Sequence, residues 1–219
     1  MGKLQSDRRG AERGSARRAV VFLHGYGADG ADLLSLADPL APYLPDCAFY
    51  APNAPQPCAG NPFGRQWFGI PRFDGSTPAQ AKAGMDAATA DLNGFIDQIL
   101  ASEGLADKDL ILLGFSQGAM MALHVAPRRA HAMAGVVAIS GKLIDSNDLL
   151  REAKVKPEVL LIHGDSDDVV PFGEMQAAQA GLTAAGFAPQ THVMRRMGHG
   201  ISQDGLQVAL EFMARRFGL

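Results

Sequence analysis

The chain has 219 residues, of which 47% are hydrophobic and 20% are charged, and its formal net charge is −3. This length suits one domain with a large core, and the small negative charge argues against nucleic-acid or anionic-membrane partners. The two cysteines, Cys47 and Cys58, form no metal-ligand pattern, and no apolar stretch is long enough for stable membrane insertion. We therefore expect free thiols and a cytoplasmic protein.

The first 18 residues differ in composition from the rest. Five arginines stand there among Gly, Ser and Gln, with almost no apolar periodicity. This composition predicts a flexible, solvated basic leader, the alternative being an arm that contacts an acidic partner. A single domain would then occupy residues 19–219.

Strand-like and helix-like segments alternate along residues 19–219, as expected for a doubly wound, mostly parallel α/β sheet flanked by helices. Strands are predicted at 19–23, 47–50, 110–113, 134–139, 159–163 and 191–195. Helices are predicted at 31–40, 78–100, 119–126 and 202–216, and residues 51–78 are predicted to form a long loop without regular structure.

A nucleophile elbow is predicted at Gly114–Gly118, which has the pattern G-x-S-x-G. It follows the apolar run Leu110–Leu113 and precedes a helical stretch. Such a tight turn presents the Ser116 hydroxyl at a helix N-terminus, where the dipole and free N–H groups favour developing negative charge. Ser116 is therefore the candidate nucleophile.

A serine nucleophile needs a base and an orienting acid, which follow it in the order acid, then histidine, in α/β-hydrolases. His199, between two glycines after the last predicted strand, is the candidate base. Three aspartates follow the strand at 159–163. The pattern G-x-x-D-x-x-V favours Asp167, with Asp168 and then Asp165 as alternatives, and a solvated helix-capping loop is the non-catalytic interpretation.

Two further loops suggest substrate contacts. The turn His24–Gly27 is glycine-rich, so the Tyr26 N–H and the Gln117 N–H are the candidate oxyanion donors, with His24 a structural hydrogen-bonding residue. In the long loop, Trp67, Phe68 and Pro55 are candidate substrate-binding residues for an acyl chain. The alternative is that these side chains only anchor the loop to the core.

Several motifs occur together in order: Leu23–Gly27, Pro52–Pro55, Trp67-Phe68, Gly114–Gly118, His163–Asp167 and Gly198–Gly200. With them the chain resembles the phospholipase/carboxylesterase family of α/β-hydrolases, which includes the acyl-protein thioesterases. The resemblance implies a Ser116-Asp167-His199 triad, oxyanion donors at Tyr26 and Gln117, no metal or cofactor, and no large lid domain. Many members have glycine in place of Ala119, and the eukaryotic thioesterases tend to have leucine in place of Tyr26.

The expected activity is hydrolysis of short- to medium-chain acyl esters through an acyl-enzyme. Lysophospholipid or acyl-protein thioester cleavage is the alternative. Some members of the family dimerise, so the resemblance also allows a homodimer. Three rivals are a metal hydrolase, a non-catalytic ligand sensor on the same fold and an acyl transferase. The six histidines show no H-E-x-x-H or similar spacing, which disfavours the first.

Overall fold

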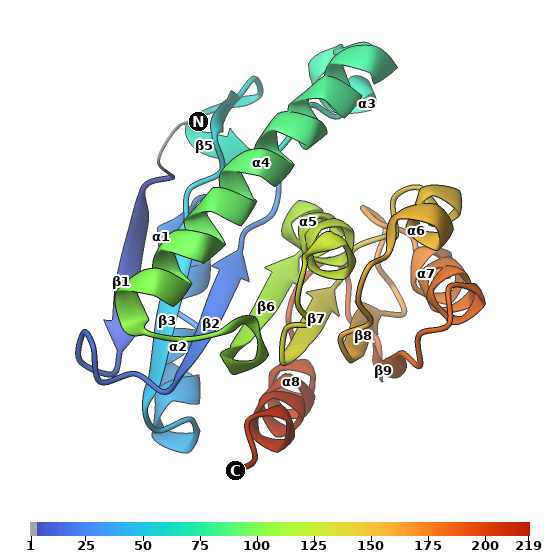
Figure 1. Ribbon diagram of the computed structural model, residues 1–219. Helices are drawn as coiled ribbons and strands as arrows, with labels where there is room; N and C mark the ends of the chain where they lie inside the picture. Colours follow the sequence, from blue (N-terminus) through green and yellow to red (C-terminus); the bar gives the residue numbers. More distant parts are fainter. Residues whose placement is uncertain (1–3) are drawn as a thin grey trace.

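The structure is a computed structural model that describes residues 4–219. Within this range, a seven-stranded sheet has the strand order β1-β3-β2-β6-β7-β8-β9 (Figure 1). Only β1, at one edge, runs antiparallel to its neighbour, and the remaining pairs are parallel. The strands are β1 Ser6–Gly10, β2 Arg18–Leu23, β3 Cys47–Pro52, β6 Leu110–Phe115, β7 Gly135–Ile139, β8 Val159–Gly164 and β9 Gln190–Met194. The predicted mostly parallel sheet is confirmed.

The apolar runs form strands because both faces of the parallel sheet are buried. In β2, Val21 and Leu23 point into one core, whereas Val20 and Phe22 point into the other. Because these strands are parallel, the carboxyl ends of β2, β6, β8 and β9 lie at one edge of the sheet, where α/β proteins carry their chemistry.

Helices cover both faces. Buried side chains of α4 to α7 belong to one core, and those of α1, α2 and α8 belong to the other. In Figure 1, the long helix α4 runs along one side of the sheet. None of the helices formed by residues 4–219 combines the length and apolar character needed to cross a membrane. Their bounds are α1 Gly30–Leu34, α2 Ala37–Leu40, α3 Pro71–Asp74, α4 Pro78–Glu103, α5 Gln117–Val125, α6 Ser146–Glu152, α7 Gly173–Ala184 and α8 Gln203–Arg216.

The expected flexible leader is wrong for its described part, since residues 4–18 include strand β1; residues 1–3 lie outside the described range. β1 adds to the edge of β3 through backbone hydrogen bonds. Arg8 of β1 donates from Nε to buried Glu103 over 2.9 Å and to the Tyr50 hydroxyl over 3.1 Å. Backbone pairing and a single ion pair leave no periodic pattern of apolar residues in the sequence. The composition of this segment therefore predicted a flexible leader and not a strand.

Two other boundaries differ from expectation. The helix predicted at 31–40 is divided into α1 and α2, because Pro39 has no N–H with which to continue the helical ladder. The loop predicted at 51–78 contains a two-stranded hairpin, β4 Gln56–Cys58 and β5 Asn61–Gln66, followed by α3. The hairpin strands are short and polar, so they lack the alternation on which the prediction depended.

Candidate active site

The turn between β6 and α5 has the backbone geometry of a nucleophile elbow. Ser116 has φ 53° and ψ −116°, a backbone conformation that residues other than glycine rarely adopt. Its N–H donates to Ile139 O of β7 over 2.8 Å, which ties the turn to the neighbouring strand. A Cβ added to Gly114 would lie 2.3 Å from Gly118 O, and one added to Gly118 would lie 1.9 Å from Leu23 O. The two glycines are therefore required by backbone approach.

His199 and Asp167 are brought together by the loops that follow β9 and β8. The Nδ1 atom of His199 lies 2.8 Å from Asp167 Oδ2. This close approach of the two loops depends on Gly164, where a Cβ would lie 2.3 Å from Met197 O. The His199 ring also packs against Phe115, with 4.9 Å between ring centroids. An imidazole held at Nδ1 by a buried carboxylate has Nε2 available for proton transfer.

The three candidate aspartates occupy different environments. Asp167 is 7% exposed, and its Oδ1 accepts the N–H groups of Val169 and Val170 over 3.0 and 2.9 Å. Asp165 Oδ1 instead accepts the N–H of Arg196, in the loop that leads to His199. Asp168 is exposed. Of the three, only Asp167 is in contact with His199 within residues 4–219.

Electrostatics keep Asp167 ionised. Burial acts to raise the pKa of its carboxyl group, but the hydrogen bonds from His199 and from the Val170 and Val169 N–H groups outweigh burial and lower the pKa below its usual range. A carboxylate in this state favours the His199 tautomer with a proton on Nδ1 and stabilises an imidazolium.

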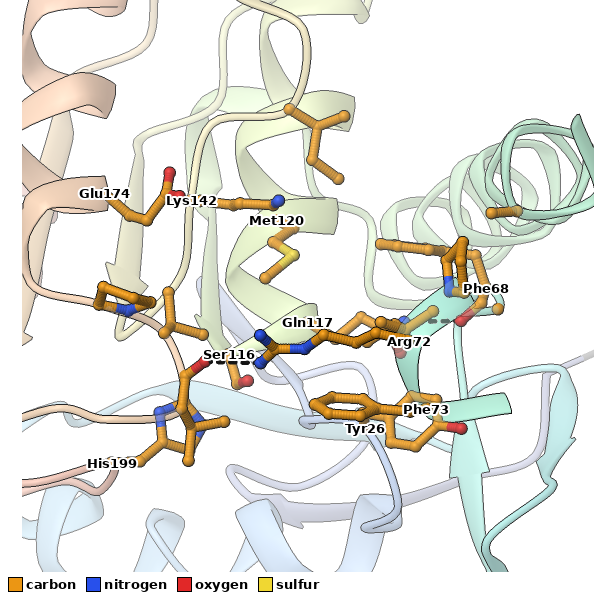
Figure 2. Close-up of a pocket in the computed structure, with 18 residues that line it drawn as sticks. Tyr26, Phe68, Arg72, Phe73, Ser116, Gln117, Met120, Lys142, Glu174 and His199 are labelled. Carbon is orange, nitrogen blue, oxygen red and sulfur yellow. Dashed lines mark hydrogen bonds between the residues drawn. The ribbon is translucent and has the colours of Figure 1, made fainter. Parts of the chain in front are cut away.

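The predicted oxyanion donors, Tyr26 and Gln117, both line the pocket that contains Ser116 and His199 (Figure 2). In the part of the chain that the structure describes, neither backbone N–H has an acceptor. Gly25 allows the first loop to approach, since its added Cβ would lie 3.3 Å from Ser116 Cβ. The two N–H groups are thus unpaired beside the serine, as stabilisation of a tetrahedral oxyanion requires.

The side chain of Gln117 has a structural role that sequence reasoning missed. Its Oε1 accepts the Trp67 N–H over 2.9 Å, and its Nε2 donates to Phe68 O over 2.7 Å. This pair of hydrogen bonds attaches the segment just after β5 to the start of α5. A sequence signal was absent, because the two segments lie about 50 residues apart.

Trp67 is part of the core and does not line the pocket, so its assignment as a substrate-binding residue is corrected. It is 0% exposed, and its Nε1 donates to His24 O over 3.0 Å. His24 in turn lies 2.8 Å from Gly25 O through Nδ1 and accepts the Ala54 N–H at Nε2. His24 is therefore the structural hydrogen-bonding residue that was predicted, and Trp67 anchors the loop.

The pocket over Ser116 has a volume of about 480 Å³. Phe68 lines it, as predicted, but Pro55 does not, because the Pro55 carbonyl faces Arg65 at the base of the hairpin. The lining also includes residues in and next to α3, in the loops after β7 and β8, and in α7. They are Ile70, Pro71, Arg72, Phe73, Lys142, Ile144, Val169, Val170, Pro171 and Glu174. The sequence had indicated only two of them, Ile70 as apolar surface of the long loop and Val170 of the G-x-x-D-x-x-V pattern.

Figure 2 shows Ser116 and His199 among the side chains that line this pocket. No hydrogen bond joins the Ser116 hydroxyl to another residue within 4–219. Such contacts are often long in unliganded active sites and tighten when substrate binds. The arrangement supplies the parts for acyl transfer, namely a hydroxyl, an imidazole, a carboxylate and two free N–H donors.

Comparisons with known proteins agree with this chemistry. A sequence profile of the family described as phospholipase/carboxylesterase matches residues 10–216. Esterase YpfH of Escherichia coli is 28% identical over 198 residues, which are 90% of this chain and 82% of that protein. Acyl-protein thioesterase 1 of Saccharomyces cerevisiae is 33% identical over 174 residues, 72% of this chain and 74% of that protein.

A solved structure, that of esterase PE8, superposes with a TM-score of 0.91 at 41% identity, covering 98% of this chain and 99% of that one. The match to the family profile extends over nearly the whole sheet, from the end of β1 to the end of α8. The chain therefore belongs to the phospholipase/carboxylesterase family of α/β-hydrolases and is a hydrolase of the carboxylesterase type.

Proposed function

We propose that this protein cleaves short- to medium-chain acyl esters through a covalent acyl-enzyme, with Ser116, His199 and Asp167 as the catalytic triad. The observation that carries the proposal is the 2.8 Å contact between His199 Nδ1 and Asp167 Oδ2 in a pocket that also contains Ser116. The three side chains come from loops after β8, β9 and β6, so their convergence depends on the fold.

The first half of the reaction forms the acyl-enzyme. His199 Nε2 takes the Ser116 proton as Oγ attacks the ester carbonyl, and Asp167 stabilises the resulting imidazolium. The N–H groups of Tyr26 and Gln117 bind the oxyanion, each worth roughly 3–4 kcal/mol. Collapse of the tetrahedral intermediate breaks the ester bond, and His199 gives its proton to the departing alcohol. Water then attacks the acyl-enzyme by the reverse sequence and releases the acid.

The size and lining of the pocket support a small acyl ester as substrate. Its volume of about 480 Å³ lies in the lower part of the range of roughly 300–1,000 Å³ typical of small-molecule sites. Phe68, Ile70, Met120 and Ile144 supply apolar surface for the chain. The similarity to a yeast acyl-protein thioesterase makes thioester cleavage the alternative, and lysophospholipid cleavage is a further one.

The decisive experiment measures turnover of 4-nitrophenyl butyrate by the Ser116→Ala variant. We expect kcat to fall by roughly 10⁴-fold or more. The control is Ser102→Ala, which removes an exposed hydroxyl at the end of α4 and is expected to leave turnover unchanged. Retention of most activity by Ser116→Ala would contradict the proposal. A panel of esters from acetate to decanoate, with a thioester and a lysophospholipid, then ranks the substrate classes.

A further inference from the structure

Arg72 extends across the opening of the pocket. It belongs to α3 on one rim, and its Nη2 donates to Val169 O, over 3.0 Å, on the opposite rim after β8. Both residues line the pocket together with Ser116. Figure 2 shows the guanidinium group reaching over the pocket toward Ser116. A permanently charged group therefore lies where a bound substrate must pass or rest.

The orientation of Arg72 is supported by its neighbours. The guanidinium carbon lies 4.6 Å from the centroid of the Phe73 ring, a cation–π contact. Phe73 in turn packs against Tyr26, with 5.7 Å between ring centroids. Asp74 Oδ2 accepts the Ile70 N–H over 2.8 Å, so the last residue of α3 is hydrogen-bonded to the residue that precedes the helix. The side chain is thus partly ordered before any ligand binds, which lowers the entropy lost on binding.

The charge of Arg72 is not neutralised within the protein. Seven other arginines in residues 4–219 form ion pairs with carboxylates, but in this range Arg72 forms none. The lining contains a second cation, Lys142, and one carboxylate, Glu174, which also lack ion pairs in the described chain. The pocket surface therefore holds two cations and one carboxylate over a mainly apolar floor, and the Asp167 carboxylate behind His199 is already engaged by hydrogen bonds. A guanidinium has five N–H donors, and Val169 O uses one.

We propose that Arg72 selects esters that carry a carboxylate group in addition to the scissile ester. This inference rests on the proposed function and names its substrate class. The guanidinium would bind the carboxylate through charge-assisted hydrogen bonds, with fork geometry that lysine cannot reproduce. The apolar part of the substrate would lie on Phe68, Ile70 and Met120 while its ester reaches Ser116.

The test compares substrates in which a carboxylate replaces a methyl group. On the acyl side, the pair is monoethyl glutarate and ethyl valerate. On the leaving-group side, it is 4-(butanoyloxy)butanoate and butyl butanoate. Acid release is followed in a pH-stat, and the measured quantity is the ratio of kcat/KM for the charged ester to that for the neutral ester. The pair with the higher ratio shows on which side of the scissile bond the carboxylate binds.

The variants are Arg72→Gln and Arg72→Lys, with Arg13→Gln as the matched control. Arg13 is exposed in the turn between β1 and β2, at the sheet edge opposite the active site. Arg13→Gln therefore changes the net charge of the protein by the same amount as Arg72→Gln, but far from the pocket. We expect Arg72→Gln to lower the ratio by about tenfold or more, as for loss of a hydrogen bond to a charged group. Arg72→Lys should lower it less, and Arg13→Gln should leave it within about twofold of the wild-type ratio.

An unchanged ratio in Arg72→Gln would overturn the inference. This outcome includes equal losses of kcat/KM for the charged and the neutral ester, which would mean that Arg72 acts only by holding Val169. Failure of the proposed function has a different signature, because wild-type protein would then hydrolyse none of the four esters. In that event, calorimetric binding of monoethyl glutarate decides, with a tenfold weaker Kd for Arg72→Gln supporting the inference and an equal Kd refuting it.

Discussion

The buried imidazole of His163 lies 3.4 Å from Asp167 Oδ2, the same carboxylate oxygen that contacts His199. Its Nε2 is also 2.8 Å from Val170 O, while the Val170 N–H donates to Asp167 Oδ1. His163 is 1% exposed and does not line the pocket. It therefore acts as a positioning residue that holds the turn carrying Asp167.

Replacement of His163 tests this role. His163→Leu leaves Val170 O without its buried donor, and we expect kcat for 4-nitrophenyl butyrate to fall by about tenfold as Asp167 loses its position. KM should change less, because the pocket lining is intact. His163→Gln, whose amide can donate to Val170 O, should recover part of the loss. Equal kcat values for wild type and His163→Leu would contradict the positioning role.

Substitution of the two neighbouring aspartates distinguishes the catalytic acid. Asp167→Asn keeps the size of the side chain but removes the charge that holds the His199 tautomer, so we expect kcat to fall by about 10³–10⁴-fold. Asp168→Asn changes an exposed side chain and should leave kcat within about twofold of wild type. Small and equal losses in the two variants would show that neither residue is the acid of the triad.

The lowered pKa of Asp167 predicts a loss of stability in acid. Because the folded-state pKa lies below the unfolded value of about 3.9, the ionised group contributes stability above that pH. The contribution decreases as pH falls below about 3.9 and through the folded-state pKa. Urea unfolding of wild type and Asp167→Asn should therefore show a free-energy difference that narrows on acidification. A difference that is constant with pH would contradict this coupling.

The elbow glycines predict a steep loss of stability on addition of one methyl group. In Gly118→Ala the new Cβ would lie 1.9 Å from Leu23 O, and a backbone atom cannot rotate away. We expect a loss of about 3 kcal/mol or more in the free energy of unfolding, as in severe overpacking. The control is Gly94→Ala in α4, where nothing lies within 4 Å, which should stabilise the helix by up to about 1 kcal/mol. Similar melting temperatures for the two variants would contradict the steric argument.

The sequence predicted correctly those features that depend on residues close to one another along the chain. The apolar runs of β2, β6 and β8 predicted buried strands because each must bury both faces in a parallel sheet. The glycines on either side of Ser116 predicted a tight turn, since the close approach of neighbouring backbone leaves no room for a Cβ at Gly114 or Gly118. The pattern after β8 favoured Asp167, whose two backbone hydrogen bonds come from residues two and three positions later.

What depended on distant residues needed the tertiary structure. Strand β1 exists because it pairs with β3 and because Arg8 meets Glu103, 95 residues away. Trp67 and Phe68 are adjacent in sequence, yet Trp67 lies in the core and Phe68 lines the pocket. Hydrogen bonds with Gln117 and His24, which are distant in sequence, fix this arrangement. Composition and spacing alone determined the fold class and the candidate triad. The walls of the pocket, including Arg72 over its opening, were decided only by packing, because their partners are not neighbours along the chain.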